Sequence, residues 1–198
     1  MGLKSKRMES VRQLMRQLEN EPSHAKQVTR LALQLFDELK LLHGLKDKER
    51  EYLEAASLLH DIGWSEGGRS HHKSSMKLIL ANDLLGWKEE EKLIIANIAR
   101  YHRKSLPKEK HSKFAALSHQ DKEIVKKLAA LLRIADGLDR SHGSYVRKVQ
   151  CQLGADRVQV TLFCNGELVM ELYGFEKKRD LFEYAFGLPI VIKDIRNA

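Results

Sequence analysis

The chain has 198 residues, of which 42% are hydrophobic. This length and composition suit one well-buried domain, with or without a small appendage, and argue against disorder as the main state. No run approaches the roughly 18 uninterrupted apolar residues that a membrane span requires, and the first ten residues lack the apolar stretch of a secretory signal. We therefore expect a cytoplasmic protein without a membrane partner.

The chain is basic: 35 Lys and Arg against 27 Asp and Glu give a formal net charge of +8 and a pI near 9.4. This balance favours anionic partners such as phosphorylated small molecules, polyphosphate or RNA. Nucleic acid is the least favoured of these, because the sequence shows no aromatic platform for stacked bases. The oligomeric state is not defined by the sequence, and a homodimer is compatible with it.

Up to about residue 142 the apolar residues recur three and four positions apart, which is the helical period. Pro22 is placed to open a helix, Gly44 and Gly63 to end helices, and Asp47 to cap one. The expected order is a helix over 4–19, a second over 22–43, a third over 47–62, two more over 71–85 and 88–102, a polar loop over 103–118, and a long apolar helix over 121–138.

After residue 144 the pattern changes to alternation, which is typical of strands. We expect three strands over 149–153, 158–162 and 168–172, with Asn165-Gly166 as a tight hairpin turn and Gly154 with Asp156 at the other connection. A helix over 176–186 and an extended segment over 189–192 follow. The predicted fold is mostly α: a helical bundle over 1–143 and, over 144–198, a small α+β appendage with an antiparallel sheet.

Four side chains have the right chemistry for one divalent cation. His24 falls in the first turn of the second helix, His60 and Asp61 fall at the end of the third, and Asp136 falls near the end of the long apolar helix. They combine neutral nitrogen and anionic oxygen donors, which suits a metal with open coordination positions. A buried Asp136 would be costly without a cation or hydrogen bonds. The sequence therefore predicts a metal site at one end of the bundle.

A His, a later His-Asp pair and a distal Asp are the pattern of the HD superfamily of metal-dependent phosphohydrolases, which this chain resembles. The resemblance implies an HD-type bundle with His24, His60, Asp61 and Asp136 as the metal ligands. It also implies a divalent cofactor, which the sequence leaves open among Mn, Mg, Fe, Co, Ni and Zn.

Further segments are similar to one branch, the C-terminal HD region of the exopolyphosphatase and guanosine pentaphosphate phosphatase family. They are 99–104, Pro107, His111, Phe114, 132–141 and 181–187, and the likeness covers most of residues 20–192. The two actin-like domains of that family, with their glycine-rich phosphate loops, are not within these residues. We therefore do not expect a complete exopolyphosphatase.

Additional histidines in HD proteins point to a second metal or to groups that support the first, and the candidates here are His71, His72, His102 and His111. Two positions depart from the pattern: Ser74 stands where the branch has a further His, and Trp64 where many active HD proteins have Lys. Metal binding is therefore the firmer expectation, and bimetallic catalysis the weaker.

Basic residues lie close to the presumed ligands in the sequence. Arg103 and Lys104 follow His102, and Arg133 and Arg140 flank Asp136 at three and four residues. Arginine can bind a phosphate through two parallel hydrogen bonds, so we expect these four residues to contact phosphate. The alternative for any basic run is a solvated face.

The expected function is metal-dependent hydrolysis of a phosphomonoester or phosphodiester, in a nucleotide-like compound, with Asp61 or Asp139 accepting the proton of the attacking water. The alternative is a non-catalytic module, related to the C-terminal part of exopolyphosphatases, that binds polyphosphate or a guanosine alarmone through its basic surface. The net charge of +8 motivates this alternative.

Overall fold

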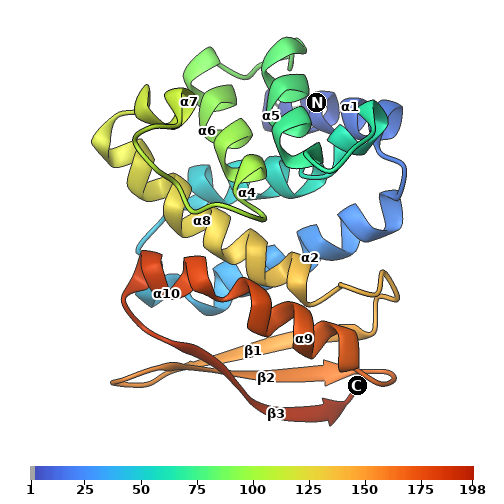
Figure 1. Ribbon diagram of the computed structural model, residues 1–198, viewed down its shortest axis with the longest axis vertical. Coiled ribbons are helices and arrows are strands. Elements are labelled where there is room, and N and C mark those ends of the chain that lie inside the picture. Colours follow the sequence, from blue (N-terminus) through green and yellow to red (C-terminus); the bar gives the residue numbers. More distant parts are fainter. Residues whose placement is uncertain (1–2) are drawn as a thin grey trace.

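The computed structural model describes residues 3–198, and the side chains from residue 6 onward (Figure 1). A helical body is followed by a three-stranded sheet with two further helices, so the predicted fold class is confirmed. The elements are α1 (Leu3–Leu18), α2 (Pro22–Glu38), α3 (Lys40–His43), α4 (Asp47–Leu58), η1 (Ile62–Glu66), α5 (His71–Ala81), α6 (Glu89–Arg100), α7 (Ser112–Ala115), α8 (His119–Gly137), β1 (Val146–Leu153), β2 (Val158–Cys164), α9 (Val169–Lys178), α10 (Asp180–Phe186) and β3 (Ile190–Asn197).

Helix α8 is the centre of the molecule, as its apolar sequence predicts. It packs against α2, α4, α6, α9 and α10 (Figure 1). Leu128, Leu131 and Leu132 are fully buried, as are Ile134 and Ala135. Asp136 is the last residue but one of α8, which ends at Gly137. The packing of this helix therefore places Asp136 in the interior. Among the described helices, none is long and apolar enough to cross a membrane.

The third helix differs from the prediction at its end. Helix α4 stops at Leu58, so His60 and Asp61 lie in the turn before η1, and Gly63 lies inside η1. The Ser75 hydroxyl of α5 donates to the carbonyl of His60 at 2.7 Å and accepts from the amide of Gly63 at 2.9 Å. A Cβ at Gly63 would come within 2.1 Å of the His71 carbonyl. Glycine is required here because α5 approaches closely, rather than to end a helix.

The predicted strand over 168–172 is wrong, because these residues begin helix α9. Leu168 and Leu172 are four residues apart and face inward together, whereas Met170 between them is 47% exposed. An alternating pattern of three residues fits both periods, and tertiary packing selects the helix. Asn165-Gly166 therefore does not form a hairpin; it connects β2 to α9.

The sheet is mixed rather than wholly antiparallel. Strands β1 and β2 form the predicted hairpin around Gly154, while β3 runs parallel to β2 in the order β1-β2-β3. A parallel neighbour needs a crossover, which α9 and α10 provide. Strand β3 is also longer than the extended segment predicted over 189–192.

Helix α2 covers the outer edge of β1. Gln34 and Glu38 accept the amides of Val149 and Cys151 at 3.0 and 2.9 Å, and Gln27 donates to the carbonyl of Val146 at 2.7 Å. These bonds satisfy backbone groups that face away from β2. The tail thus packs on the body through α2, α8 and α9, and the division into domains at residue 143 stays a prediction.

Two glycines bring α9 against α8. A Cβ at Gly174 would lie 2.3 Å from the carbonyl oxygen of Gly137, and a Cβ at Gly137 would lie 2.9 Å from the backbone of Gly174. The helices therefore touch backbone to backbone just after Asp136. This close approach places the C-terminal end of α9 beside the end of α8.

We expect Gly174→Ala to lower the free energy of unfolding by about 2–3 kcal/mol, because the added methyl group meets backbone that cannot rotate away. Chemical denaturation of the purified protein measures this change. Val169→Ala, at a 69% exposed position of the same helix, is the matched control and should stay within about 0.5 kcal/mol of the wild type. Equal stability of the two variants would contradict the close approach.

Candidate metal centre

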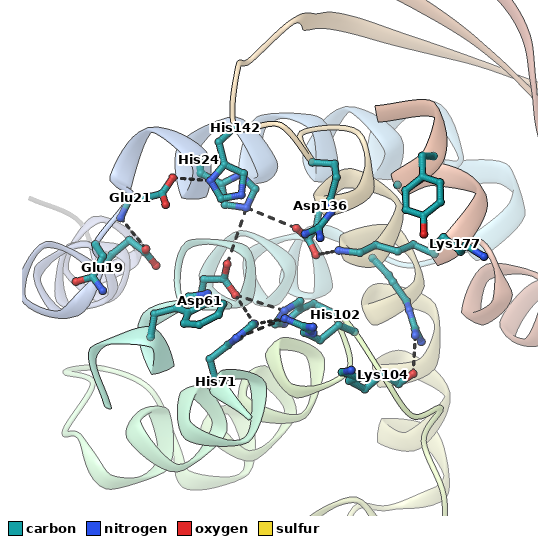
Figure 2. A pocket seen from close by; sticks show the side chains of 18 residues that line it. Glu19, Glu21, His24, Asp61, His71, His102, Lys104, Asp136, His142 and Lys177 are labelled. Atoms are coloured by element: carbon teal, nitrogen blue, oxygen red, sulfur yellow. Dashed lines mark hydrogen bonds and ion pairs between the residues drawn. The ribbon is translucent and has the colours of Figure 1, made fainter. Parts of the chain in front are cut away.

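A cavity of about 720 Å³ opens at the end of the bundle where α2, α8 and α9 meet η1 and the turn after α6 (Figure 2). Its walls carry acidic, basic and aromatic side chains. The lining residues are Glu19, Asn20, Glu21, His24, Asp61, Trp64, His71, His102, Arg103, Lys104, Arg133, Asp136, Arg140, His142, Tyr173, Gly174, Lys177 and Lys178.

Of the four side chains predicted as metal ligands, His24, Asp61 and Asp136 line this cavity, and His60 is fully buried next to them. Nε2 of His24 lies 3.5 Å from Oδ1 of Asp136 and 4.0 Å from Oδ2 of Asp61. Nε2 of His60 lies 3.6 Å from Oδ2 of Asp61 and 4.0 Å from Oδ1 of Asp136. All four are buried, so segments more than 100 residues apart in the sequence present their donor atoms to one point.

Each of these two imidazoles is oriented by a bond from its other nitrogen. Nδ1 of His24 lies 2.8 Å from a carboxylate oxygen of Asp139, and Nδ1 of His60 lies 2.7 Å from the carbonyl oxygen of Ser57. When such a ring is neutral, with its proton on Nδ1, the lone pair of Nε2 faces the centre, which is the arrangement of metal-binding histidines. Among the described residues, neither Nε2 atom has a hydrogen-bond partner. A divalent cation would satisfy both, so the donor set fits a metal.

A second group of donors shares Asp61. Its Oδ1 atom lies 3.2 Å from Nε2 of His71 and 3.4 Å from Nε2 of His102, whose Nδ1 bonds the carbonyl of Ala99 at 2.7 Å. The two groups, His24-His60-Asp136 and Asp61-His71-His102, each hold their donor atoms within 4.8 Å of one another. Asp61 thus turns one carboxylate oxygen to each group (Figure 2).

The other two candidate histidines do not line the cavity. His72 is buried behind His71, and burial lowers its pKa to about 4. Nδ1 of His111 lies 2.8 Å from the hydroxyl of Tyr101. Asp139, a predicted proton acceptor, is fully buried behind His24, where it also accepts the amide of Ser144 at 2.8 Å. Of the two predicted acceptors, Asp61 alone lines the cavity.

The cavity floor keeps its carboxylates ionised. Burial acts to raise the pKa of Asp136, but Lys178 and His24 outweigh it and hold that pKa well below its usual range. Burial likewise opposes ionisation of Asp61, and His60 and His71 lower its pKa. Burial disfavours a charged His24, yet the nearby carboxylates of Asp136 and Asp139 raise its pKa to about 10. The ionised carboxylates of Asp61 and Asp136 therefore bring negative charge to the cavity floor, which favours the binding of cations.

The four predicted phosphate contacts all line the cavity. Arg103 donates to Nε2 of His71 at 3.0 Å, and Arg140 is exposed at the rim. Arg133 is buried and donates to the carbonyl of Lys104 at 2.6 Å, which fixes the turn that carries both Lys104 and Arg103. These positions put positive charge around the anionic floor.

Several lining residues were not predicted. The ring of Trp64 stacks on His71 with centroids 4.0 Å apart, and the ring of His142 stacks on His24 at 3.8 Å. Nδ1 of His142 lies 2.5 Å from the Glu21 carboxylate. Tyr173 and Lys177 come from α9, as does Lys178, which makes an ion pair with Asp136. The prediction left Tyr173 between a strand over 168–172 and a helix over 176–186, and it did not place Lys177 and Lys178 of that helix beside the metal ligands.

A family model described as Ppx/GppA phosphatase, domain III, matches residues 6–177 of the chain. The matched segment contains all six side chains of the two donor groups.

We expect Asp139→Asn to weaken binding of Mn²⁺ by about ten- to hundredfold, because Nδ1 of His24 loses its charged partner and the ring loses its fixed orientation. Calorimetric titration of the metal-free protein measures this. Asp156→Asn, in the exposed turn between β1 and β2, is the control with the same chemical change and unaltered affinity. Unchanged affinity in Asp139→Asn would show that Asp139 does not position His24.

Proposed function

The chain belongs to the Ppx/GppA phosphatase, domain III family, and on this basis we propose that it is a metal-dependent phosphohydrolase of the HD type. Its substrate would be a phosphomonoester or phosphodiester in a nucleotide-like compound. The observation that carries the proposal is the pair of buried donor groups, linked by the two carboxylate oxygens of Asp61, beneath a basic cavity.

His24, His60, Asp61 and Asp136 would hold the first cation, and His71 and His102 would join Asp61 in holding a second. When bound, a divalent cation supplies Lewis acidity that polarises a phosphate and makes water a stronger acid. Asp139, Ser57 and Ala99 keep the donor nitrogens turned inward through their bonds to Nδ1.

Side chains that line the cavity would accept the proton, balance the charge on the phosphate and contact the rest of the substrate. Asp61 lines the cavity, and we assign it the role of accepting a proton from an attacking water. Arg103, Lys104 and Arg140 surround the floor and would balance the charge that develops on the phosphoryl oxygens. Trp64 is 43% exposed at the same cavity, where its ring offers an apolar contact to the organic part of a substrate.

We expect His60→Ala and Asp61→Ala to reduce kcat/KM for a phosphomonoester by at least about hundredfold, since each removes a donor from the floor of the site. The assay uses the protein stripped with a chelator and reloaded with manganese, magnesium, cobalt or nickel. His119→Ala, at an exposed position of α8, is the control and should retain activity. Full activity in both reloaded variants would refute metal-dependent hydrolysis at this site.

A second candidate function is binding without turnover, of polyphosphate or a guanosine alarmone. It is favoured by the basic groups that converge on the cavity, Arg103, Lys104, Arg133, Arg140, Lys177 and Lys178. Such a module would bind polyphosphate tightly, with an affinity that falls steeply as salt rises, because binding releases counterions. Titration at several salt concentrations, with release of inorganic phosphate followed in parallel, separates the two: a binding module gives the salt dependence and no phosphate release.

A further inference from the structure

Lys178 is the last residue of α9, and its ammonium group contacts Oδ2 of Asp136 inside the cavity. This ion pair is drawn as a dashed line at Asp136 in Figure 2. The side chain of Lys178 is 15% exposed and that of Asp136 is 11% exposed, so water screens the pair weakly. A buried carboxylate needs such a partner, because an unpaired charge is costly in the interior.

The other oxygen of the same carboxylate faces the candidate metal ligands. Oδ1 of Asp136 lies 3.5 Å from Nε2 of His24 and 4.0 Å from Nε2 of His60. A divalent cation held by these three groups would therefore share one carboxylate with the ammonium group of Lys178. The cation and the ammonium group would then lie on the two oxygens of one carboxylate and repel each other. This repulsion is strong where the surroundings exclude water. Lys178 and the cation would thus compete for Asp136.

The main chain of Lys178 is held in place, whereas its side chain can move within the cavity. Gly137 and Gly174 hold α9 against α8, so the helix is not free to withdraw. The four-carbon stem of a lysine carries its charge through several ångströms, and the side chain already lines the cavity. Its neighbour Lys177 lies over the ring of Tyr173 instead, 5.6 Å from the centroid.

We propose that Lys178 is a tethered counter-ion that changes partner. In the metal-free protein it neutralises Asp136; when a divalent cation takes that carboxylate, its ammonium group moves to a phosphate group bound in the cavity. The proposal rests on the proposed function, because it needs a metal at the candidate centre. It assigns Lys178 two consequences of opposite sign: it weakens metal binding and strengthens phosphate binding.

The test compares the wild type with Lys178→Met, which keeps the length of the stem and removes the charge. Mn²⁺ is titrated into the chelator-treated full chain by calorimetry, and inorganic phosphate is then titrated into the Mn²⁺-saturated protein. We expect Lys178→Met to bind Mn²⁺ about tenfold more tightly and phosphate about tenfold more weakly, the size of one charge-assisted contact. The melting temperature of the metal-free variant should fall, because Asp136 loses its partner.

Three further variants support the comparison. Lys178→Arg keeps the charge and should keep Mn²⁺ affinity close to that of the wild type. Lys193→Met makes the same chemical change at an exposed position of β3 and should alter neither affinity. Lys178→Gln repeats the test if circular dichroism shows that Lys178→Met does not fold.

The outcomes are distinct. Unchanged or weaker Mn²⁺ binding by Lys178→Met would overturn the competition and leave Lys178 as a structural partner of Asp136. Tighter Mn²⁺ binding with unchanged phosphate binding would overturn the change of partner. If neither the wild type nor Lys178→Met binds Mn²⁺, Mg²⁺, Co²⁺ or Ni²⁺, the proposed function fails and the exchange fails with it. Metal binding by the variant alone would support the exchange in its strongest form.

Discussion

The cost of burying ionised carboxylates is the constraint on which the rest of this structure depends. Asp61 and Asp136 are buried at the floor of the cavity, where an unpaired charge is costly. Imidazoles from α2, α5 and two turns converge on them, and a lysine reaches them from α9. The site is therefore a balance of charge assembled from segments distant in the sequence.

Backbone packing determines which partners are available. The contact between Gly137 and Gly174 places the end of α9 beside the end of α8, and the cavity gains one wall from the tail of the chain. At the opposite wall, Gly63 lets α5 approach closely enough for His71 to face Asp61. The glycines at the α8–α9 contact and at the contact of Gly63 with α5 thus determine the width of the cavity and the charges that line it. Larger side chains would separate the walls from the floor.

Residues at helix ends could be placed from the sequence, because the helical period and the turn residues locate those ends within a few positions. His24 and Asp136 are clear examples, and the His-Asp pair was misplaced only by the early end of α4. The start of α9 could not be predicted, since Leu168, Met170 and Leu172 fit a strand equally well and only packing on α8 decides. Lys178 falls in the helix predicted over 176–186, but its contact with Asp136 was missed. Its role depends on a contact between helices that leaves no local signal.

Helix α2 serves both halves of the molecule. Its first turn carries His24 to the candidate metal centre, and its later turns, through Gln34 and Glu38, accept hydrogen bonds from the outer amides of β1. Local opening of this one helix would withdraw a metal donor and uncover an unpaired strand edge in the same event. If the proposed cation binds, its loss and the exposure of an aggregation-prone edge are therefore coupled, and any ligand that holds His24 in place also protects the sheet from self-association.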